Sequence, residues 1–146
     1  MKGLFKNTVL FTVLVTVFSF TLTTDQSAYG IKVEKSITQV KEHLYQVSVK
    51  IDNGNIINGI AKYEARLPIT ADFVKEVSKD QTVNFKVDGR KLKIIWMHIQ
   101  KNKSYTTVFQ FKSKLSIDKL KMNGIIFGHK DGDKFSVEDT TSFIKF

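Results

Sequence analysis

Apolar and polar residues alternate along most of this chain, and that alternation limits the folds it can form. Within segment 43–51 the apolar positions fall on one face: Tyr45, Val47, Val49 and Ile51. Segments 61–67 and 105–115 repeat the pattern, and the second has Gln110, Lys112 and Lys114 between apolar positions. A period of two is typical of strands that bury one face. Turn sequences such as 52–55 separate the segments, so the chain predicts an all-β domain.

The segment 82–97 predicts a β-hairpin. An Asp88-Gly89 loop of two residues favours a type I′ turn, because both loop positions need positive φ. That loop predicts three pairs, Val87 with Arg90, Phe85 with Leu92 and Val83 with Ile94. The apolar side chains then share one face with Trp96, and a slip of one residue would expose them to water.

The segment 69–79 interrupts the strand rhythm after Pro68, the only proline. Its apolar residues have helical spacing: Ile69, Phe73, Val74 and Val77. With Thr70 as a cap, the spacing predicts a short crossover helix or turn, with a strand as the alternative. Phe135, Val137, Phe143 and Phe146 predict one or two closing strands. Seven to nine short strands indicate an immunoglobulin-like, two-sheet antiparallel β-sandwich over residues 31–146, with a closed barrel as the rival.

The first thirty residues predict export. Lys2 and Lys6 precede an uncharged run over residues 8–22, and Ala28-Tyr29-Gly30 places small residues at positions −3 and −1 of a cut after Gly30. A basic start, an apolar run and a small-x-small site are the three parts of a secretory signal peptide. The run is shorter than the roughly 20 residues that cross a bilayer core. We therefore expect residues 1–30 to be cleaved, with an uncleaved anchor or a strand of the domain as alternatives.

Composition is consistent with one exported domain. The chain has no cysteine, so a core must stabilise it without disulfides, and thiol catalysis is excluded. Its net charge of +9 suits a soluble surface or a partner such as an anionic polysaccharide. The lysines are spread along the chain, which favours a solvated surface, and we expect no nucleic-acid partner.

No residue pattern in the chain predicts catalysis. His43, His98 and His129 lack metal-ligand spacing, and no Gly-x-Ser-x-Gly or phosphate loop is present. Asp131-Gly132-Asp133 lacks the ordered ligands of a calcium loop and fits a hairpin turn better. We therefore predict no enzyme, no cofactor and no metal site.

Four residues are candidates for an interaction patch. Alternation places Ile94 and Trp96 inward, which leaves Ile95 and Met97 on the opposite face. That face is covered within the domain or is open to a partner, as exposed apolar patches often are. Tyr63 beside Lys62, and Tyr105 near Lys103, are candidates for stacking on sugar rings, although each ring also suits a core.

Several stretches together resemble a known family. They are Val-Ser-Val-Lys-Ile-Asp-Asn-Gly (47–54), Asn-Gly-Ile-Ala-Lys-Tyr (58–63), Leu-Pro (67–68) and Phe-Lys-Val-Asp-Gly-Arg-Lys-Leu-Lys-Ile-Ile-Trp-Met (85–97). Over roughly residues 45–112, this order resembles exported bacterial immunoglobulin-like domains with the layout of the cohesin-type sandwich. The resemblance implies a two-sheet fold and a scaffold or adhesive role, and it assigns no site residue.

These observations predict a non-catalytic exported binding or structural module in the periplasm, on the cell surface or secreted. Its partner would be an envelope or surface protein, bound through a sheet face or an edge strand. One alternative is a glycan- or ligand-binding protein that uses a basic aromatic face. Another is a membrane-tethered component of an export or surface assembly, which requires that the leader is retained.

Overall fold

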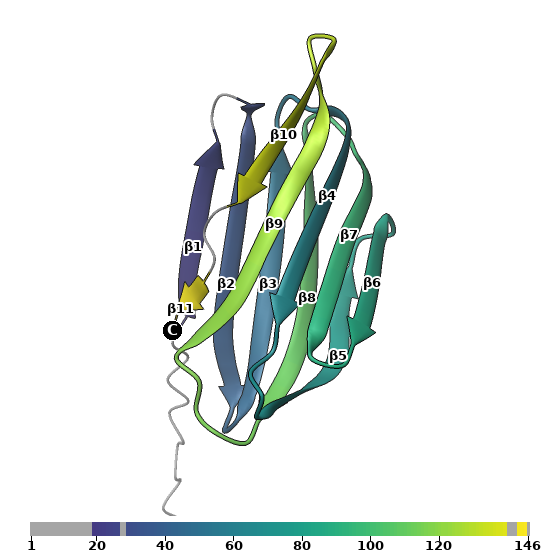
Figure 1. The fold of residues 1–146 in the computed structure, drawn as a ribbon. Helices are drawn as coiled ribbons and strands as arrows, with labels where there is room; N and C mark the ends of the chain where they lie inside the picture. The colour runs from purple at the N-terminus through teal and green to yellow at the C-terminus, as the bar shows by residue number, and fades with distance from the viewer. Residues whose placement is uncertain (1–18, 27–28, 140–142, 146) are drawn as a thin grey trace, which may run out of the picture.

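The computed structural model describes residues 19–26, 29–139 and 143–145, and these residues form two antiparallel β-sheets. Figure 1 shows the sheets as two layers, with the β10-β9-β4-β7-β6 sheet toward the viewer. The strands are β1 (Ser19–Gln26), β2 (Ile31–Lys41), β3 (Leu44–Asn53), β4 (Ile57–Arg66), β5 (Ala71–Lys79), β6 (Val83–Asp88), β7 (Lys91–Ile99), β8 (Lys103–Ser113), β9 (Lys119–Lys130), β10 (Asp133–Asp139) and β11 (Phe143–Lys145). The predicted all-β, immunoglobulin-like sandwich is confirmed.

Sheet A has the strand order β1-β2-β3-β8-β5, and sheet B has the order β10-β9-β4-β7-β6. The short strand β11 also pairs with β9, beyond the end of β10. In sheet B, β4 lies between β9 and β7 and pairs with both. Its outward side chains therefore lie at the middle of the outer face, which we define as the face of sheet B turned away from sheet A.

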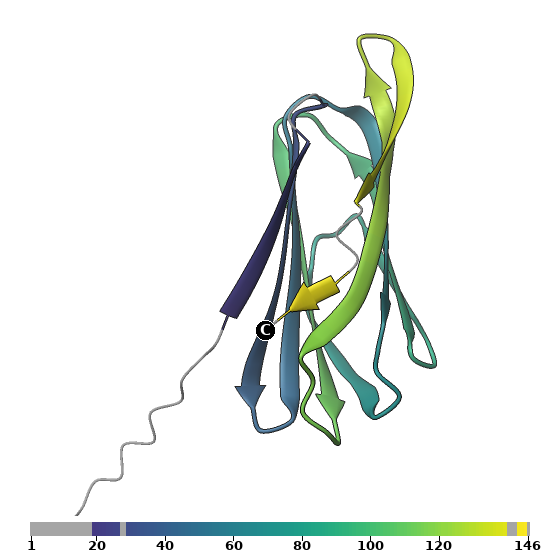
Figure 2. The ribbon, with the colours of Figure 1, turned by 60° about the vertical axis from the view of Figure 1, so that its left-hand side comes forward.

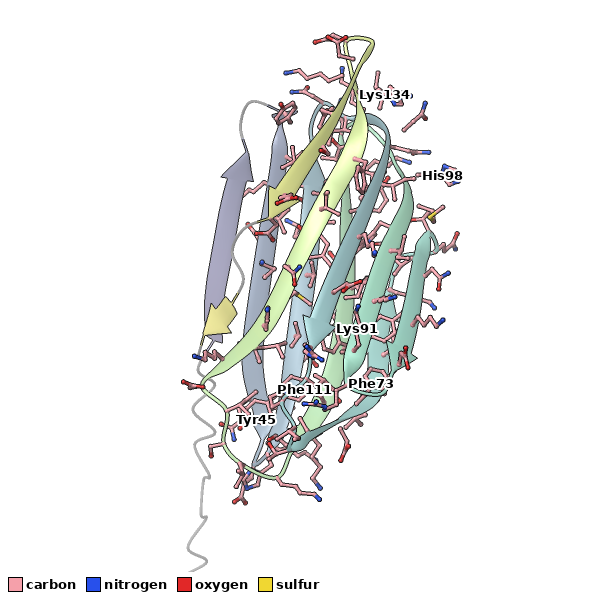
Figure 3. The ribbon with its side chains drawn as sticks, in the orientation of Figure 1. Tyr45, Phe73, Lys91, His98, Phe111 and Lys134 are labelled. Carbon is pink, nitrogen blue, oxygen red and sulfur yellow. The ribbon has the colours of Figure 1, made fainter. Side chains whose placement is uncertain are left out.

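The core lies between the two sheets and is built from the inward positions of the alternation. Trp96 and Tyr63 are fully buried and meet edge to face, with ring centroids 5.8 Å apart. At the other end of the core, Tyr45 stacks on Phe111 at 5.3 Å (Figure 3). Each large apolar side chain buried in this way contributes about 1.5–3 kcal/mol. A core of this kind stabilises the domain without disulfides.

The β6–β7 hairpin forms with the predicted faces but a different register. The pairs are Val87 with Leu92, Phe85 with Ile94 and Val83 with Trp96, so the loop is Gly89-Arg90. Of these two loop residues only Gly89 has positive φ, +54°. A glycine at the first loop position favours a type II′ turn, whereas the predicted type I′ turn needs positive φ at both. The pairing shifts by two residues, which keeps the apolar set on one face.

The helix predicted near 69–79 is wrong and the strand alternative is confirmed, because the segment forms strand β5 after a turn at Pro68–Ala71. Strand β5 pairs with β8, and its register shifts twice, between Phe73 and Lys75 and between Glu76 and Ser78. Each irregularity interrupts the period of two, so the more buried positions of β5 are Ala71, Phe73 and Glu76. Of the four apolar residues with helical spacing only Phe73 is half-buried, because Ile69, Val74 and Val77 are 83%, 46% and 45% exposed.

The N-terminal strand β1 falls inside the segment that we predict to be a signal peptide. It pairs antiparallel with β2 along all eight of its residues. The basic start, most of the apolar run and Ala28 lie outside the described residues, as does Phe146. Cleavage after Gly30 therefore stays a prediction. Among the described residues, no helix has the length and apolar character needed to span a membrane.

Candidate interaction surface

The outer face of sheet B carries a group of exposed apolar side chains from three adjacent strands. Ile60 on β4, Met97 on β7 and Phe127 on β9 are 39%, 41% and 42% exposed. Ile60 is directly opposite Phe127 in the β4–β9 pairing. Half-buried Ile95 and Ile125 flank Lys62 in the next row. We call these five apolar residues the apolar patch.

The alternation of β4 explains why the patch faces outward. Ala61, Tyr63 and Ala65 are buried, so the residues between them point away from the core. A bulge between Gly59 and Ala61 lies beside His98, which has a φ of +63°. Figure 3 shows His98 toward the upper end of β7 and Lys91 toward its lower end. Met97 therefore places the patch in the half of the outer face near His98.

The half of the outer face near Lys91 is charged. Glu64 accepts from Lys91 at 2.9 Å and lies 3.5 Å from Lys62. The hydrogen bond from Lys91 is the main reason that the pKa of Glu64 is lowered. Lys121 and Asn123 on β9 continue this charged and polar region beside Glu64. The outer face thus joins an apolar half to a half with paired charges.

A shallow hollow of about 570 Å³ lies in the charged half. Its charged lining residues are Lys62, Lys121, Glu64, Glu138 and Asp139. The buried Lys35 pairs with Asp139, so the two lysines and two glutamates of the lining balance each other and the hollow has no excess positive charge to favour an anion. A polar rim beside an apolar centre is instead the arrangement found in protein–protein interfaces.

The two tyrosine candidates do not lie on this surface. Tyr63 is 0% exposed beneath the outer face, and Tyr105 is 7% exposed. The Tyr105 hydroxyl accepts the Gln100 N–H at 2.8 Å and so braces the loop before β8. Buried rings cannot stack on an external ligand. Of the four predicted residues, Met97 and, in part, Ile95 reach the surface.

A buried ion pair joins the two sheets behind the hollow. The Lys35 Nζ on β2 lies 2.7 Å from the Asp139 Oδ2 on β10, with the two side chains 0% and 2% exposed. The same ammonium lies 6.0 Å from the centre of the Tyr63 ring. Burial, together with the nearby Asp139 carboxylate, raises the pKa of Tyr63. Lys35 alternates with Val33 and Ile37, which places it inward, but nothing in the sequence pattern identifies Asp139 as its partner.

The histidines and the acidic turn have local structural roles. His43 and His98 occupy positive-φ positions, at a hairpin turn and beside a bulge. Asp131 and Gly132 form the two-residue loop between β9 and β10, and both have positive φ, as a type I′ turn requires. The hairpin interpretation of this sequence is confirmed. Within the described ranges, no group of three or more His, Asp or Glu side chains is placed to hold a metal.

Comparisons with known proteins extend these findings at the level of fold. No protein-family model matches the sequence, and no curated protein matches it. Domains D2 and D3 of the major pilin SpaD from Corynebacterium diphtheriae match with a TM-score of 0.54 and 14% identity, over 73% of this chain and 49% of that one. The collagen-binding domain of the Erysipelothrix rhusiopathiae surface protein RspB matches with a TM-score of 0.51 and 11% identity, over 88% of this chain and 56% of that one.

A cohesin module from a Clostridium perfringens glycoside hydrolase also matches, with a TM-score of 0.46 and 14% identity, over 88% of this chain and 95% of that one. The chain spans about half the length of the SpaD and RspB structures. At these identities the likeness is one of fold. It confirms the resemblance to bacterial immunoglobulin-like surface domains in that sense.

Proposed function

We propose that this chain is an exported, non-catalytic binding module that recognises a protein through the apolar patch of sheet B. The observation that carries the proposal is the contiguity of Ile60, Met97 and Phe127 across three neighbouring strands. Isolated exposed apolar residues are common on protein surfaces, but a contiguous group with a polar rim is typical of an interaction site. A flat sheet face of this kind suits a folded partner.

The ion pairs beside the apolar patch support a protein partner. The Glu64 carboxylate neutralises part of the cationic charge of Lys62 and Lys91. Exposed ion pairs of this kind contribute little affinity, but they set the orientation of a partner. The glycan alternative loses both of its candidate tyrosines, which are buried, and would have to use Phe127, the exposed aromatic side chain of the apolar patch. Binding of anionic polymers that weakened steeply with salt would support that alternative instead.

The predicted leader supports export as the setting of this function. A basic start and an uncharged run precede the domain, and the cysteine-free composition leaves stability to the core. The processed domain would act in the periplasm, at the cell surface or outside the cell. An envelope or surface protein is therefore the class of partner that we propose.

A pair of charge substitutions tests the patch. Met97→Lys with Phe127→Lys should lower the recovery of a cross-linked envelope partner by about tenfold or more, because each buried apolar anchor contributes about 1–3 kcal/mol. The matched control is Ile69→Lys with Leu115→Lys, since those side chains are 83% and 61% exposed and lie outside the patch. Equal losses in both variants, or no loss in either, would contradict the proposal. Thermal unfolding of each variant shows whether the fold is retained.

A further inference from the structure

One edge of sheet A is formed by a strand that the predicted cleavage would remove. Strand β1 lies within residues 1–30, and it pairs with β2 at every position from Ser19 with Thr38 to Gln26 with Ile31. Beyond β2 the sheet order continues to β3, so β1 is the outermost strand on this side. Removing it would leave β2 as an edge with unpaired backbone N–H and C=O groups.

The side chains of β2 show what the loss of β1 would uncover. Its inward residues Ile31, Val33, Lys35 and Ile37 are at most 2% exposed when β1 is in place. The short strand β11 lies against both β1 and β2, and Figure 2 shows it beside them at this side of the sandwich. Lys35 also carries the ion pair with Asp139. Without β1, an apolar strip and a buried charge pair would lie next to an open backbone edge.

The geometry points to a second binding site: we propose that processing converts β2 into an acceptor for an extended strand of an exported partner protein. This inference rests on the proposed export and cleavage. The partner segment would pair antiparallel with Ile31–Thr38 over about eight residues, the span that β1 occupies. Backbone hydrogen bonds supply affinity in such strand addition, and alternate side chains supply specificity.

The register of β1 defines the chemistry of that segment. Phe20 and Leu22 pair with Ile37 and Lys35, and Thr24 pairs with Val33. Directly opposed residues of an antiparallel pair point to the same face, so a donor residue opposite Ile37, Lys35 or Val33 would face the core as those buried residues do. A suitable segment has apolar residues at alternate positions and no proline, because proline would remove a ladder hydrogen bond.

A second copy of this chain fits the edge poorly. Symmetric antiparallel pairing of β2 with itself must be centred on one residue, since opposed side chains share a face. Centring it on Glu34 or on Lys35 places two like charges opposite each other, which is destabilising. Centring it on Ser36 or Ile37 extends the pairing to Gln39 and beyond, where the register of β2 against β3 becomes irregular. Centring it on Val33 places Lys32 opposite Glu34, but in a chain that starts at Ile31 it pairs only the five residues 31–35. A donor from another protein has none of these restrictions.

The test compares processed with unprocessed protein. The full chain is produced once with export and once without it, and mass spectrometry determines each N-terminus. A synthetic peptide with the sequence of residues 19–26 is then titrated into both. We expect the peptide to bind the processed form and to slow hydrogen exchange at β2 amides by about tenfold or more. The unprocessed form, whose edge is occupied, should show no change.

Controls separate strand addition from non-specific contact. The same peptide with Thr23→Pro and Thr24→Pro together should lose binding, because one of two successive N–H groups must point to β2 and proline removes that ladder hydrogen bond. If the processed form is unfolded on its own, recovery of β-sheet circular dichroism with the original peptide, but not with the proline peptide, also supports the proposal.

The contradicting outcomes are distinguishable. A processed form that starts at Ile31 but neither binds the peptide nor gains protection would overturn strand acceptance and leave the proposed export intact. A processed form that dimerises through β2 would make a second copy the occupant and overturn the proposed partner class. Retention of Met1 after export would overturn both the acceptor edge and the proposed cleavage.

Discussion

Removal of the buried lysine should destabilise the domain far more than removal of an exposed lysine on the same strand. Lys35 and Asp139 approach to 2.7 Å with side chains 0% and 2% exposed. Lys35→Met removes the ammonium and leaves the carboxylate buried without its cation, which costs about 3–5 kcal/mol. With a urea m-value of about 1.5 kcal/mol/M, the unfolding midpoint should fall by about 2 M or more.

Strand β2 provides a control at the same interatomic distance. Lys32 and Glu34 also approach to 2.7 Å, but their side chains are 49% and 29% exposed. Lys32→Met should therefore cost about 0–1 kcal/mol, as exposed ion pairs do. The double variant Lys35→Met with Asp139→Leu replaces both charges by apolar groups and should recover most of the lost stability. Similar midpoints for the two single variants, or no recovery in the double variant, would refute this reasoning.

Three further substitutions test the core, a loop and the charged half of the outer face. Gly124→Ala should lower the free energy of unfolding in a urea titration by about 2 kcal/mol or more, because an added Cβ would overlap the Tyr63 ring. A urea midpoint within error of wild type would show that the ring moves aside. Asn53→Ala should cost about 2–3 kcal/mol in the same assay, since the buried side chain donates to two carbonyl groups and accepts one N–H. Glu64→Gln should lower stability near neutral pH but not in acid. The folded pKa of Glu64 is lowered from 4.5 mainly by the Lys91 hydrogen bond, so its contribution is present above that value and is lost as pH falls. An unchanged difference between wild type and Glu64→Gln from pH 7 to pH 2 would contradict this assignment.

The alternation of apolar and polar residues predicted well which side chains of a strand face the core. Each residue's own apolar or polar character decides its face, whichever strands lie beside it. The alternation placed Ala61, Tyr63 and Ala65 on one face, and all three are buried. The same reasoning placed Ile95 and Met97 outward. The proposal that Tyr63 binds a ligand therefore conflicted with its own strand pattern, which is the stronger signal for a large aromatic side chain.

The patch as a whole could not be predicted, because neighbours across a sheet depend on strand order. Ile60 and Phe127 are far apart in sequence and meet only when β4 pairs with β9. The partner of Lys35 is equally remote, on β10. Irregular strands are a second limit, since β5 has two register shifts and exposes Val74 and Val77, which left no period of two to mark it as a strand. The register of a turn is a third limit on prediction. The predicted Asp88-Gly89 loop needs positive φ at both positions, whereas in the observed loop Gly89 alone has positive φ.

Site-specific photo-cross-linking tests the central claim most directly. A photoreactive residue is introduced at Met97, within the apolar patch, and in a matched variant at Ile69, which is 83% exposed and outside it. Both proteins are exported in the native host and irradiated in intact cells. The account predicts a discrete protein adduct from position 97 that is absent from position 69. Equal adducts from both positions, or adducts from position 69 alone, would contradict recognition through the apolar patch.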